Sequence, residues 1–238
     1  HIRQTFYDSN WYLKAQEIYA AYPYENEPLA SNISLESLGM SRAVNKPFVF
    51  ITTDETYSQR AINISSEFDL NPWILGSGYE YRRLDYFSKT KPFFILPIDF
   101  PSKPNVVKPM SDLQYSTAEL KHWDIAPDNL FYLNNAGHDF SITSHYMKKK
   151  SEFRKNLQKV IDRGLSEDIV LSALTTQPAE ALGMQKSLGK IAPGYDANLV
   201  VVDGEYFDPK SKIVSVWIEG KEHYIASKKT PTFLGTWS

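Results

Sequence analysis

Residues 138 to 145, HDFSITSH, carry side chains suited to metal binding or acid–base chemistry: two histidines and an aspartate around strand-forming residues. A strand rises about 3.3 Å per residue and alternates faces, which places His138 and His145 on opposite faces and about 23 Å apart. Asp139 and His145 share a face but lie about 20 Å apart, far beyond the roughly 2 Å of a zinc–ligand bond. The stretch cannot bind a metal ion by itself.

Other polar residues follow apolar runs along the chain. Asp54 and Glu55 follow KPFVFITT, and Asp99 follows FFILPI. Because catalytic groups of parallel α/β barrels lie at the carboxyl ends of strands, we predict Asp99, Ser144 and His145 as candidate catalytic residues. His145 can equally be a polar loop residue, and Asp54 with Glu55 can be an acid–base pair or a helix cap. Neighbouring residues on a strand point apart, which disfavours a Ser144–His145 nucleophile and base.

The segment GSGYEYRR, residues 76 to 83, combines two glycines with aromatic and basic side chains. Such a segment can bind an anionic ligand at a helix N-terminus. We therefore predict Gly78 and Tyr79 as substrate-binding residues, together with Thr53 near the end of the strand expected over 46–54. A tight turn between a strand and a helix explains the glycines equally well.

The elements that must position these residues alternate along the chain. Short apolar runs, typical of buried strands, are separated by segments with helical periodicity, a pattern that predicts βαβ units and a parallel sheet. An N-terminal helix is expected over residues 9–22 with Asp8 or Ser9 as its cap, and a second after Ser34. The predicted strands are 46–54, 71–78, 91–101 and 138–145.

The C-terminal part of the chain has a different character. Helices are predicted over 149–163, with Gly164 as the C-cap, and from Ser166 onward. In the last fifty residues, GKIAPGYDANLVVVDG and KIVSVWIEGKEHYI are rich in β-formers. They predict a small antiparallel sheet that follows the α/β part.

Composition restricts the possible functions. The 238 residues are 42% hydrophobic and 14% aromatic, which allows a sizeable core. The net charge of -2, with scattered basic residues, argues against nucleic acid as a partner. Cysteine is absent, which excludes disulfides and thiolate sites, and no apolar run has the length of a membrane span. The chain starts at His1 without a typical lead-in, so we expect an excised or processed segment.

Two motifs near the C-terminus carry a family resemblance. ALTTQPAEALG (173–183) and GKIAPGYDANLVVVDG (189–204) resemble the closing segment of the amidohydrolase superfamily, particularly its imidazolonepropionase-like and dihydroorotase-like branches. Asn198 stands where an aspartate is usual in that pattern. The whole chain further resembles the first of two amidohydrolase-like halves in long tandem proteins of Bacteroidetes-type bacteria.

The resemblance implies a fold and a chemistry. The implied fold of this chain is α/β: it would be part of a TIM-like (β/α)8 metal-dependent hydrolase barrel, with a small β-sandwich segment at the C-terminus. Residues 1–185 would form the second half of the barrel, and 186–238 the C-terminal part of the flanking sandwich. Family members hold one or two divalent ions, usually zinc, which lower the pKa of a bound water for attack on an amide or cyclic amide carbon.

The metal ligands that the resemblance implies are missing from this sequence. The fifth-strand histidine position falls on Thr52 or Thr53, the sixth on Gly76 or Gly78, and the eighth-strand aspartate near Ser144. Hydroxyl groups are poor zinc ligands beside imidazole or carboxylate, and the chain contains no His-x-His. We therefore expect no metal in this segment and a non-catalytic scaffold. The alternative is that it contributes pocket residues to a hydrolase whose metal ligands lie elsewhere.

The resemblance also bears on partners and compartment. The expected partner is the rest of a parent polypeptide or a second amidohydrolase half, with a small-molecule ligand also possible. A periplasmic or secreted location is implied by the resemblance alone.

Overall fold

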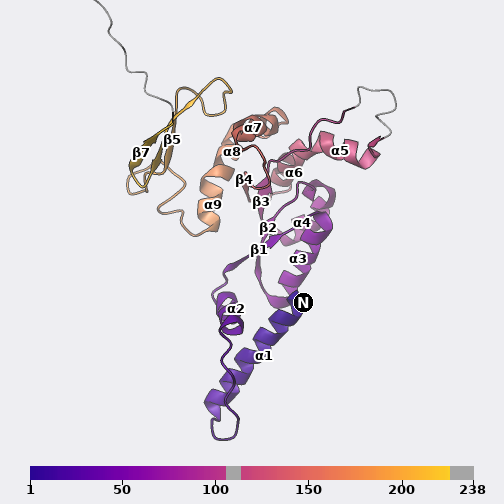
Figure 1. Cartoon of the computed structure of the whole chain (residues 1–238), viewed down its shortest axis with the longest axis vertical. Coiled ribbons are helices and arrows are strands. Elements are labelled where there is room, and N and C mark those ends of the chain that lie inside the picture. Colours follow the sequence, from indigo (N-terminus) through magenta and orange to yellow (C-terminus); the bar gives the residue numbers. More distant parts are fainter. Residues whose placement is uncertain (106–113, 226–238) are drawn as a thin grey trace, which may run out of the picture. The chain divides into compact units, whose positions relative to one another are not determined.

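The computed structural model describes residues 1–105 and 114–225 (Figure 1). By internal packing the chain divides into two compact units. The first comprises His1–Leu96 and Tyr132–Asp139, and the second comprises Pro97–Phe131 and the chain from Phe140 onward. The elements up to β3 are α1 Ile2–Ala21, α2 Ile33–Ala43, β1 Pro47–Ile51, α3 Glu55–Phe68, β2 Asn71–Leu75, the 3-10 helix Glu80–Arg83, α4 Leu84–Thr90 and β3 Phe93–Pro97.

The later elements begin at Thr117. The 3-10 turn Ala126–Asp128 separates α5 from α6. These elements are α5 Thr117–Ile125, α6 Asn129–Asn135, β4 Phe140–Thr143, the 3-10 turn Lys150–Glu152, α7 Phe153–Asp162, α8 Glu167–Leu174, α9 Thr176–Ala181, β5 Leu199–Val202, β6 Ile213–Ile218 and β7 Lys221–Tyr224.

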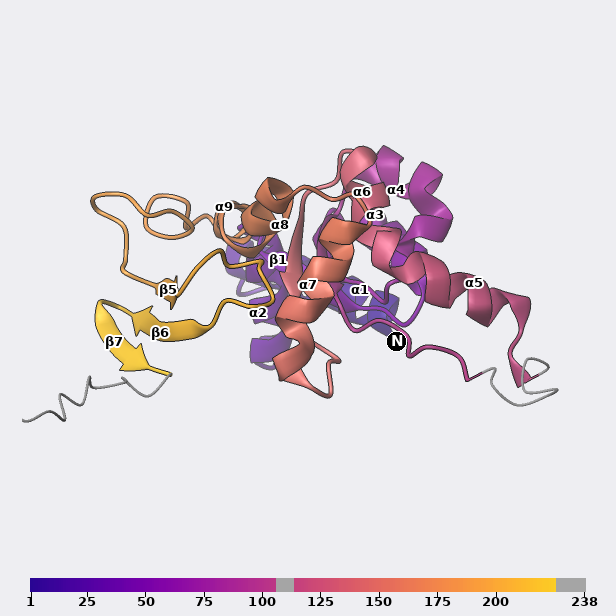
Figure 2. The ribbon, with the colours of Figure 1, turned by 90° about the horizontal axis from the view of Figure 1, so that it is seen from above.

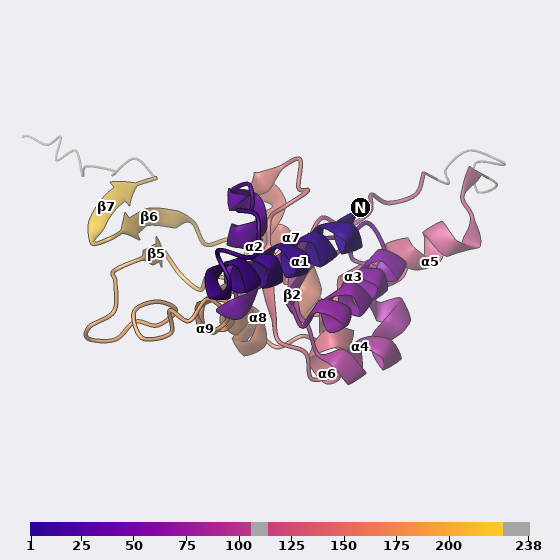
Figure 3. The same ribbon diagram turned by 90° about the horizontal axis from the view of Figure 1, so that it is seen from below.

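Helix α1 starts seven residues before the predicted start at residue 9, so that expected boundary is wrong. Ser9 is no cap: it lies within the helix, is buried, and donates to the carbonyl of Leu35 in α2 at 2.8 Å. The first turns are held by tertiary contacts, since Phe6 stacks on Phe68 with ring centroids 5.0 Å apart. Figures 1 and 3 show α1 lying against α2.

The predicted parallel α/β sheet is confirmed, with strand order β1-β2-β3-β4. Strands β1 and β2 run parallel with Pro47 opposite Asn71, and β2 pairs with β3 in the same direction. In the first unit Ile74, Phe87 and Phe94 have no exposed surface, so strand and helix side chains form one apolar layer. Helix α3 contacts both β2 and α4, and its proximity to α4 is visible in Figure 3.

Strand β1 is covered on one side only. Phe48 and Phe50 pack against the cluster around Phe6, whereas Val49 and Ile51 on the opposite face are 53% and 70% exposed. Strands of parallel sheets are normally buried on both faces. The exposed face of β1 is therefore an apolar surface that lacks a cover within the described residues.

The second unit contains the C-terminal helices and a small sheet. A helix is found where one was predicted from Ser166 onward, and Ser166 caps it with its side chain accepting from the backbone of Ile169. Strands β5, β6 and β7 form the predicted antiparallel sheet, and all three are labelled in Figure 2. The proposed boundary at 185/186 lies between α9 and β5 and stays a prediction. None of the described helices combines the length and apolar composition that crossing a bilayer needs.

Candidate functional site

Thr52 follows β1 and is buried with its hydroxyl fully engaged. Its Oγ1 donates to the carbonyl of Leu75 at 3.0 Å and lies 2.9 Å from Oγ of Ser58 in α3. Thr53, the predicted substrate-binding residue beside it, is exposed. The hydroxyl of Thr52 thus ties β1 to β2 and to α3 and is not presented to solvent.

The turn after β2 is built around a buried carboxylate. Glu80 has no exposed surface, and its Oε1 accepts from the backbone N–H of Ser77 at 2.7 Å. Its Oε2 accepts from the N–H of Gly78 at 3.0 Å, and the Ser77 hydroxyl lies 3.3 Å from Oε1. A Cβ at Gly76 would lie 2.7 Å from Oε1 of Glu80. The carboxylate therefore fills the space that a side chain at position 76 would need.

The predicted substrate-binding residues Gly78 and Tyr79 belong to the same turn. Gly78 has a φ of +89°, which other residues rarely adopt, and its N–H is already bound by Glu80. The Tyr79 ring lies under the guanidinium of Arg82, 4.5 Å from the ring centroid. This geometry favours the tight turn over the anion site, and the substrate-binding role stays a prediction.

Asp54 caps helix α3. Its Oδ1 accepts from the backbone of Thr56 at 2.8 Å and of Tyr57 at 3.0 Å. The neighbouring Glu55 forms an ion pair with Arg82 at 3.6 Å. Of the two alternatives that the sequence left open, the cap is the one the geometry supports.

Asp99 and Ser144 follow adjacent strand ends in the second unit. The N–H of Ile98 donates to the carbonyl of Thr143 at 3.4 Å, which brings the carboxyl ends of β3 and β4 side by side. Asp99 is exposed, and Ser144 is half-buried. Lys150 donates to the backbone carbonyl of Ser144, and its Nζ lies 3.2 Å from the Ser144 Oγ.

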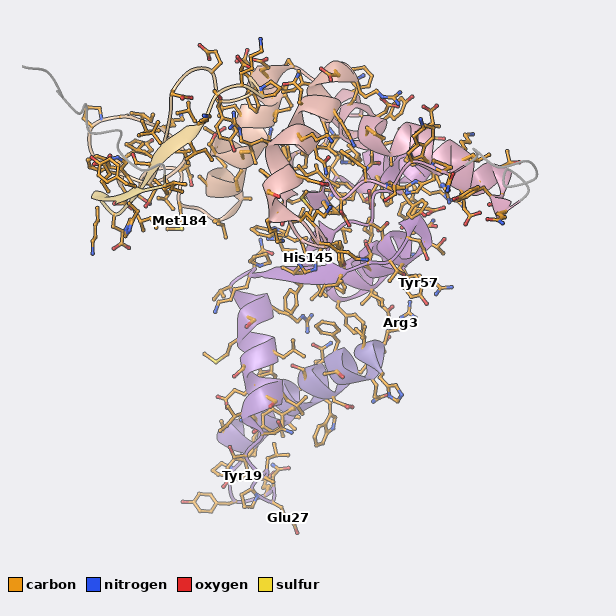
Figure 4. The ribbon with its side chains drawn as sticks, turned by 45° about the horizontal axis from the view of Figure 1, so that its top comes forward. Arg3, Tyr19, Glu27, Tyr57, His145 and Met184 are labelled. Carbon is orange, nitrogen blue, oxygen red and sulfur yellow. The ribbon has the colours of Figure 1, made fainter. Side chains whose placement is uncertain are left out.

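His145 is exposed at the end of β4 and is labelled in Figure 4. Its backbone N–H donates to Oγ1 of Thr143 at 3.1 Å, and its ring packs edge-on against Tyr146 with centroids 4.2 Å apart. A hydrogen bond between the side chains of Ser144 and His145 is absent from the part of the chain that the structure describes. Their catalytic role, with that of Asp99, stays a prediction.

His138 lies at the opposite end of β4 from His145. It is 4% exposed, and neither ring nitrogen has a hydrogen-bond partner within residues 1–105 and 114–225. Its ring meets Phe94 edge-on with centroids 5.3 Å apart. Burial lowers the pKa of His138, and the charge of Lys91 lowers it further while Asp139 acts in the opposite direction.

Sequence reasoning missed Glu80, the most buried carboxylate of these strand ends. Ser77 and Glu80 have the S-x-x-E spacing of a capping box, in which the glutamate accepts from the backbone of the serine. That spacing was visible in GSGYEYRR. Among the described residues, no group of three or more His, Asp or Glu side chains could hold a metal ion.

Comparisons with known proteins bear on the family. Residues 125–223 match the sequence profile of the amidohydrolase family. Amidohydrolase tasK of Hapsidospora irregularis is 41% identical over 61 residues, which are 26% of this chain and 6% of that protein. The crystal structure of an amidohydrolase from Thermotoga maritima MSB8 aligns with a TM-score of 0.72 and 24% identity. These matches confirm the resemblance to the amidohydrolase superfamily.

The amidohydrolase-like chain corresponds to only part of these proteins. The alignment with the Thermotoga maritima structure covers 94% of this chain and 54% of that one. A Xaa-Pro dipeptidase with methionine bound in its active site aligns with a TM-score of 0.59 and 13% identity, over 79% of this chain and 47% of that chain. The amidohydrolase-like chain therefore spans about half the length of the solved structures, whose similarity concerns the fold.

Proposed function

We propose that this chain is a framework part of an amidohydrolase-like barrel and does not itself supply the metal centre. The observation that carries the proposal is the turn after β2. There the carboxylate of Glu80 occupies the space next to Gly76, which with Gly78 is one of the two positions where the resemblance implies a metal-binding histidine. A side chain at position 76 would displace the group that organises this turn.

The other donors at the strand ends also do not fit a zinc site. Thr52 offers a hydroxyl that is already bound to Leu75 and Ser58, and the Ser144 hydroxyl has Lys150 beside it. Zinc prefers imidazole, thiolate and carboxylate ligands, and a nearby ammonium group further disfavours a cation. The metal-dependent hydrolysis typical of the family would thus take place on residues outside this chain.

A second candidate function is a contribution to the substrate pocket of an active hydrolase. The hydrogen bond between Ile98 and Thr143 favours it, because it places Asp99 and Ser144 after neighbouring strand ends. The exposed side chains of Asp99 and His145 could then contact a substrate whose metal ligands come from elsewhere in the barrel.

Both functions require further β/α units beside this chain. The exposed apolar residues Val49 and Ile51 of β1 support that requirement, since a barrel buries such residues in its interior. The alignment over about half of the Thermotoga maritima structure agrees with it. The partner we propose is therefore the remainder of a parent polypeptide or a second amidohydrolase-like half.

The test is made on the intact parent protein, purified with zinc supplied. We compare the wild type with the triple variant Asp99→Ala, Ser144→Ala and His145→Ala for metal content and for hydrolysis of dipeptide and cyclic amide substrates. The framework role predicts unchanged metal content and unchanged kinetics. A raised KM with unchanged metal content would instead support the substrate-pocket function.

Loss of one metal equivalent in the triple variant would overturn both functions, because these strand ends would then hold the ion. A triple variant at exposed surface positions, Lys121→Ala, Glu167→Ala and Lys190→Ala, serves as the matched control for folding and yield.

A further inference from the structure

A groove of about 390 Å³ lies between helix α7 and the turn that follows β5, within the second unit. Its volume is in the range of small-molecule sites. Helix α7 contributes positively charged side chains, and the turn contributes apolar ones. Its lining includes Arg154, Lys155, Lys159, Asp162, Phe207 and Pro209.

Arg154 fixes the two walls of the groove relative to each other. Its guanidinium donates to the carbonyl of Tyr206 at 3.0 Å, of Ser211 at 2.9 Å and of Asp208 at 2.9 Å. It also lies 5.2 Å from the centroid of the Tyr206 ring. All of these carbonyl acceptors are neutral, so the hydrogen bonds hold Arg154 in place without cancelling its charge.

Two lysines add to this charge. Lys155 and Lys159 are four residues apart on α7 and therefore project from one face of the helix. Neither forms an ion pair within the described ranges, and the Lys159 ammonium lies 5.9 Å from the centroid of the Phe100 ring. Asp162, the carboxylate of this groove, accepts a hydrogen bond from the neutral amide of Gln158 at 2.9 Å and keeps its negative charge, so the positive charges of Arg154, Lys155 and Lys159 outnumber it.

The opposite wall is apolar and partly aromatic. Phe207 and Pro209 line it, and the Phe207 ring is held edge-on by Tyr206 with centroids 5.2 Å apart. An aromatic ring facing a set of cations suits a ligand that has a flat ring at one end and a strong anion at the other. Arginine and lysine bind phosphate well, and flat rings stack on phenylalanine.

We propose that this groove binds a small organic phosphate with a flat ring, of the chemical type of a nucleoside monophosphate. The phosphate lies against Lys155 and Lys159 in the field of Arg154, and the ring packs on Phe207. The inference is independent of the proposed framework function, because it uses no residue of the strand ends.

The intact protein is titrated with AMP, adenosine and inorganic phosphate at physiological salt, and the affinity for each is measured by calorimetry. AMP is expected to bind more tightly than either fragment. The double variant Lys155→Glu and Lys159→Glu is expected to weaken AMP binding by about tenfold or more, as loss of charge-assisted hydrogen bonds does. Phe207→Ala is expected to weaken AMP while leaving inorganic phosphate unchanged.

The matched control is the double variant Lys186→Glu and Lys190→Glu, which makes the same charge change at exposed positions outside the groove. The proposal is overturned if AMP does not bind, or if the control weakens AMP as much as the groove variant. Equal affinity for AMP and inorganic phosphate would overturn the role of Phe207. Near-ultraviolet circular dichroism of each variant verifies the fold.

Discussion

In the first unit, Glu80 and His138 are both buried and ionisable, but their hydrogen-bonding environments are opposite. The carboxylate of Glu80 has no exposed surface and accepts hydrogen bonds from two backbone N–H groups and a hydroxyl. The imidazole of His138 is 4% exposed, and both its nitrogens lack partners in the described part of the chain. A buried carboxylate needs donors, whereas a neutral imidazole tolerates an apolar site at lower cost.

The difference separates a carboxylate that organises a turn from an imidazole whose pKa is lowered by burial. Glu80 organises the turn after β2, which contains Gly76 and Gly78. His138 sits at the other end of the sheet, in contact with Phe94, where its ring has no hydrogen-bond partner among the described residues. Four substitutions test the contrast, and the largest expected effect comes first.

Glu80→Ala should destabilise the protein most. The N–H groups of Ser77 and Gly78 would lose their acceptor, and a cavity would open beside Gly76. We expect a loss of about 2 to 4 kcal/mol in the free energy of unfolding, measured by urea denaturation of the intact protein. Glu80→Gln, which keeps one acceptor, should lose less. A loss below about 1 kcal/mol in Glu80→Ala would contradict a structural role for this carboxylate.

Gly76→Ala should cost about 1 to 3 kcal/mol of unfolding free energy, because its Cβ would lie 2.7 Å from Oε1 of Glu80. The backbone of Gly76 does not adopt a positive φ, so the cost arises from the contact and not from strain. In a Glu80→Ala background the same substitution should cost less. Equal costs in both backgrounds, measured by the same denaturation, would refute the contact.

His138→Phe should remove an acid sensitivity. The unfolded chain has a histidine pKa near 6.5, while burial lowers the pKa of His138 in the folded protein. Between these two values only the unfolded state binds the proton, so stability falls as the pH drops below about 6.5 and levels off below the lowered pKa. The loss is about 1.4 kcal/mol for each unit by which the pKa is lowered.

The measurement compares the unfolding free energy near neutral pH and at about pH 5, below the histidine reference value. The wild type should lose more stability on acidification than His138→Phe. His145→Phe, at an exposed position, is the matched control and should behave like the wild type. Identical pH profiles for the wild type and His138→Phe would show that His138 does not set the acid response.

Ser77→Ala should have the smallest effect, about 0.5 kcal/mol of unfolding free energy. The hydroxyl lies 3.3 Å from Oε1 of Glu80, which is long for this type of hydrogen bond, and both backbone donors remain. A loss comparable to that of Glu80→Ala would shift the organising role from the carboxylate to the serine side chain. Urea denaturation of the two variants in parallel distinguishes these outcomes.

Local features were predictable from the sequence. The order of strands and helices follows from apolar runs and helical periodicity, and Asp54 and Ser166 were readable as caps because a cap depends on neighbouring residues. The start of α1 was not predictable in this way. Its first turns are held by residues distant in sequence: Phe6 stacks on Phe68, and the guanidinium of Arg3, labelled in Figure 4, pairs with Glu67 at 2.6 Å.

The candidate site likewise has features that follow from the sequence and features that depend on tertiary contacts. The sequence by itself determined which residues follow the strands, among them Thr52 and Thr53 after the first and Gly76 and Gly78 after the second. Only the tertiary structure decided that a carboxylate three residues beyond Ser77 turns back and fills the space beside Gly76. Spacing along the chain specifies local hydrogen bonds, but the space available to a side chain depends on elements brought together by folding, here the turn and Leu96 of β3.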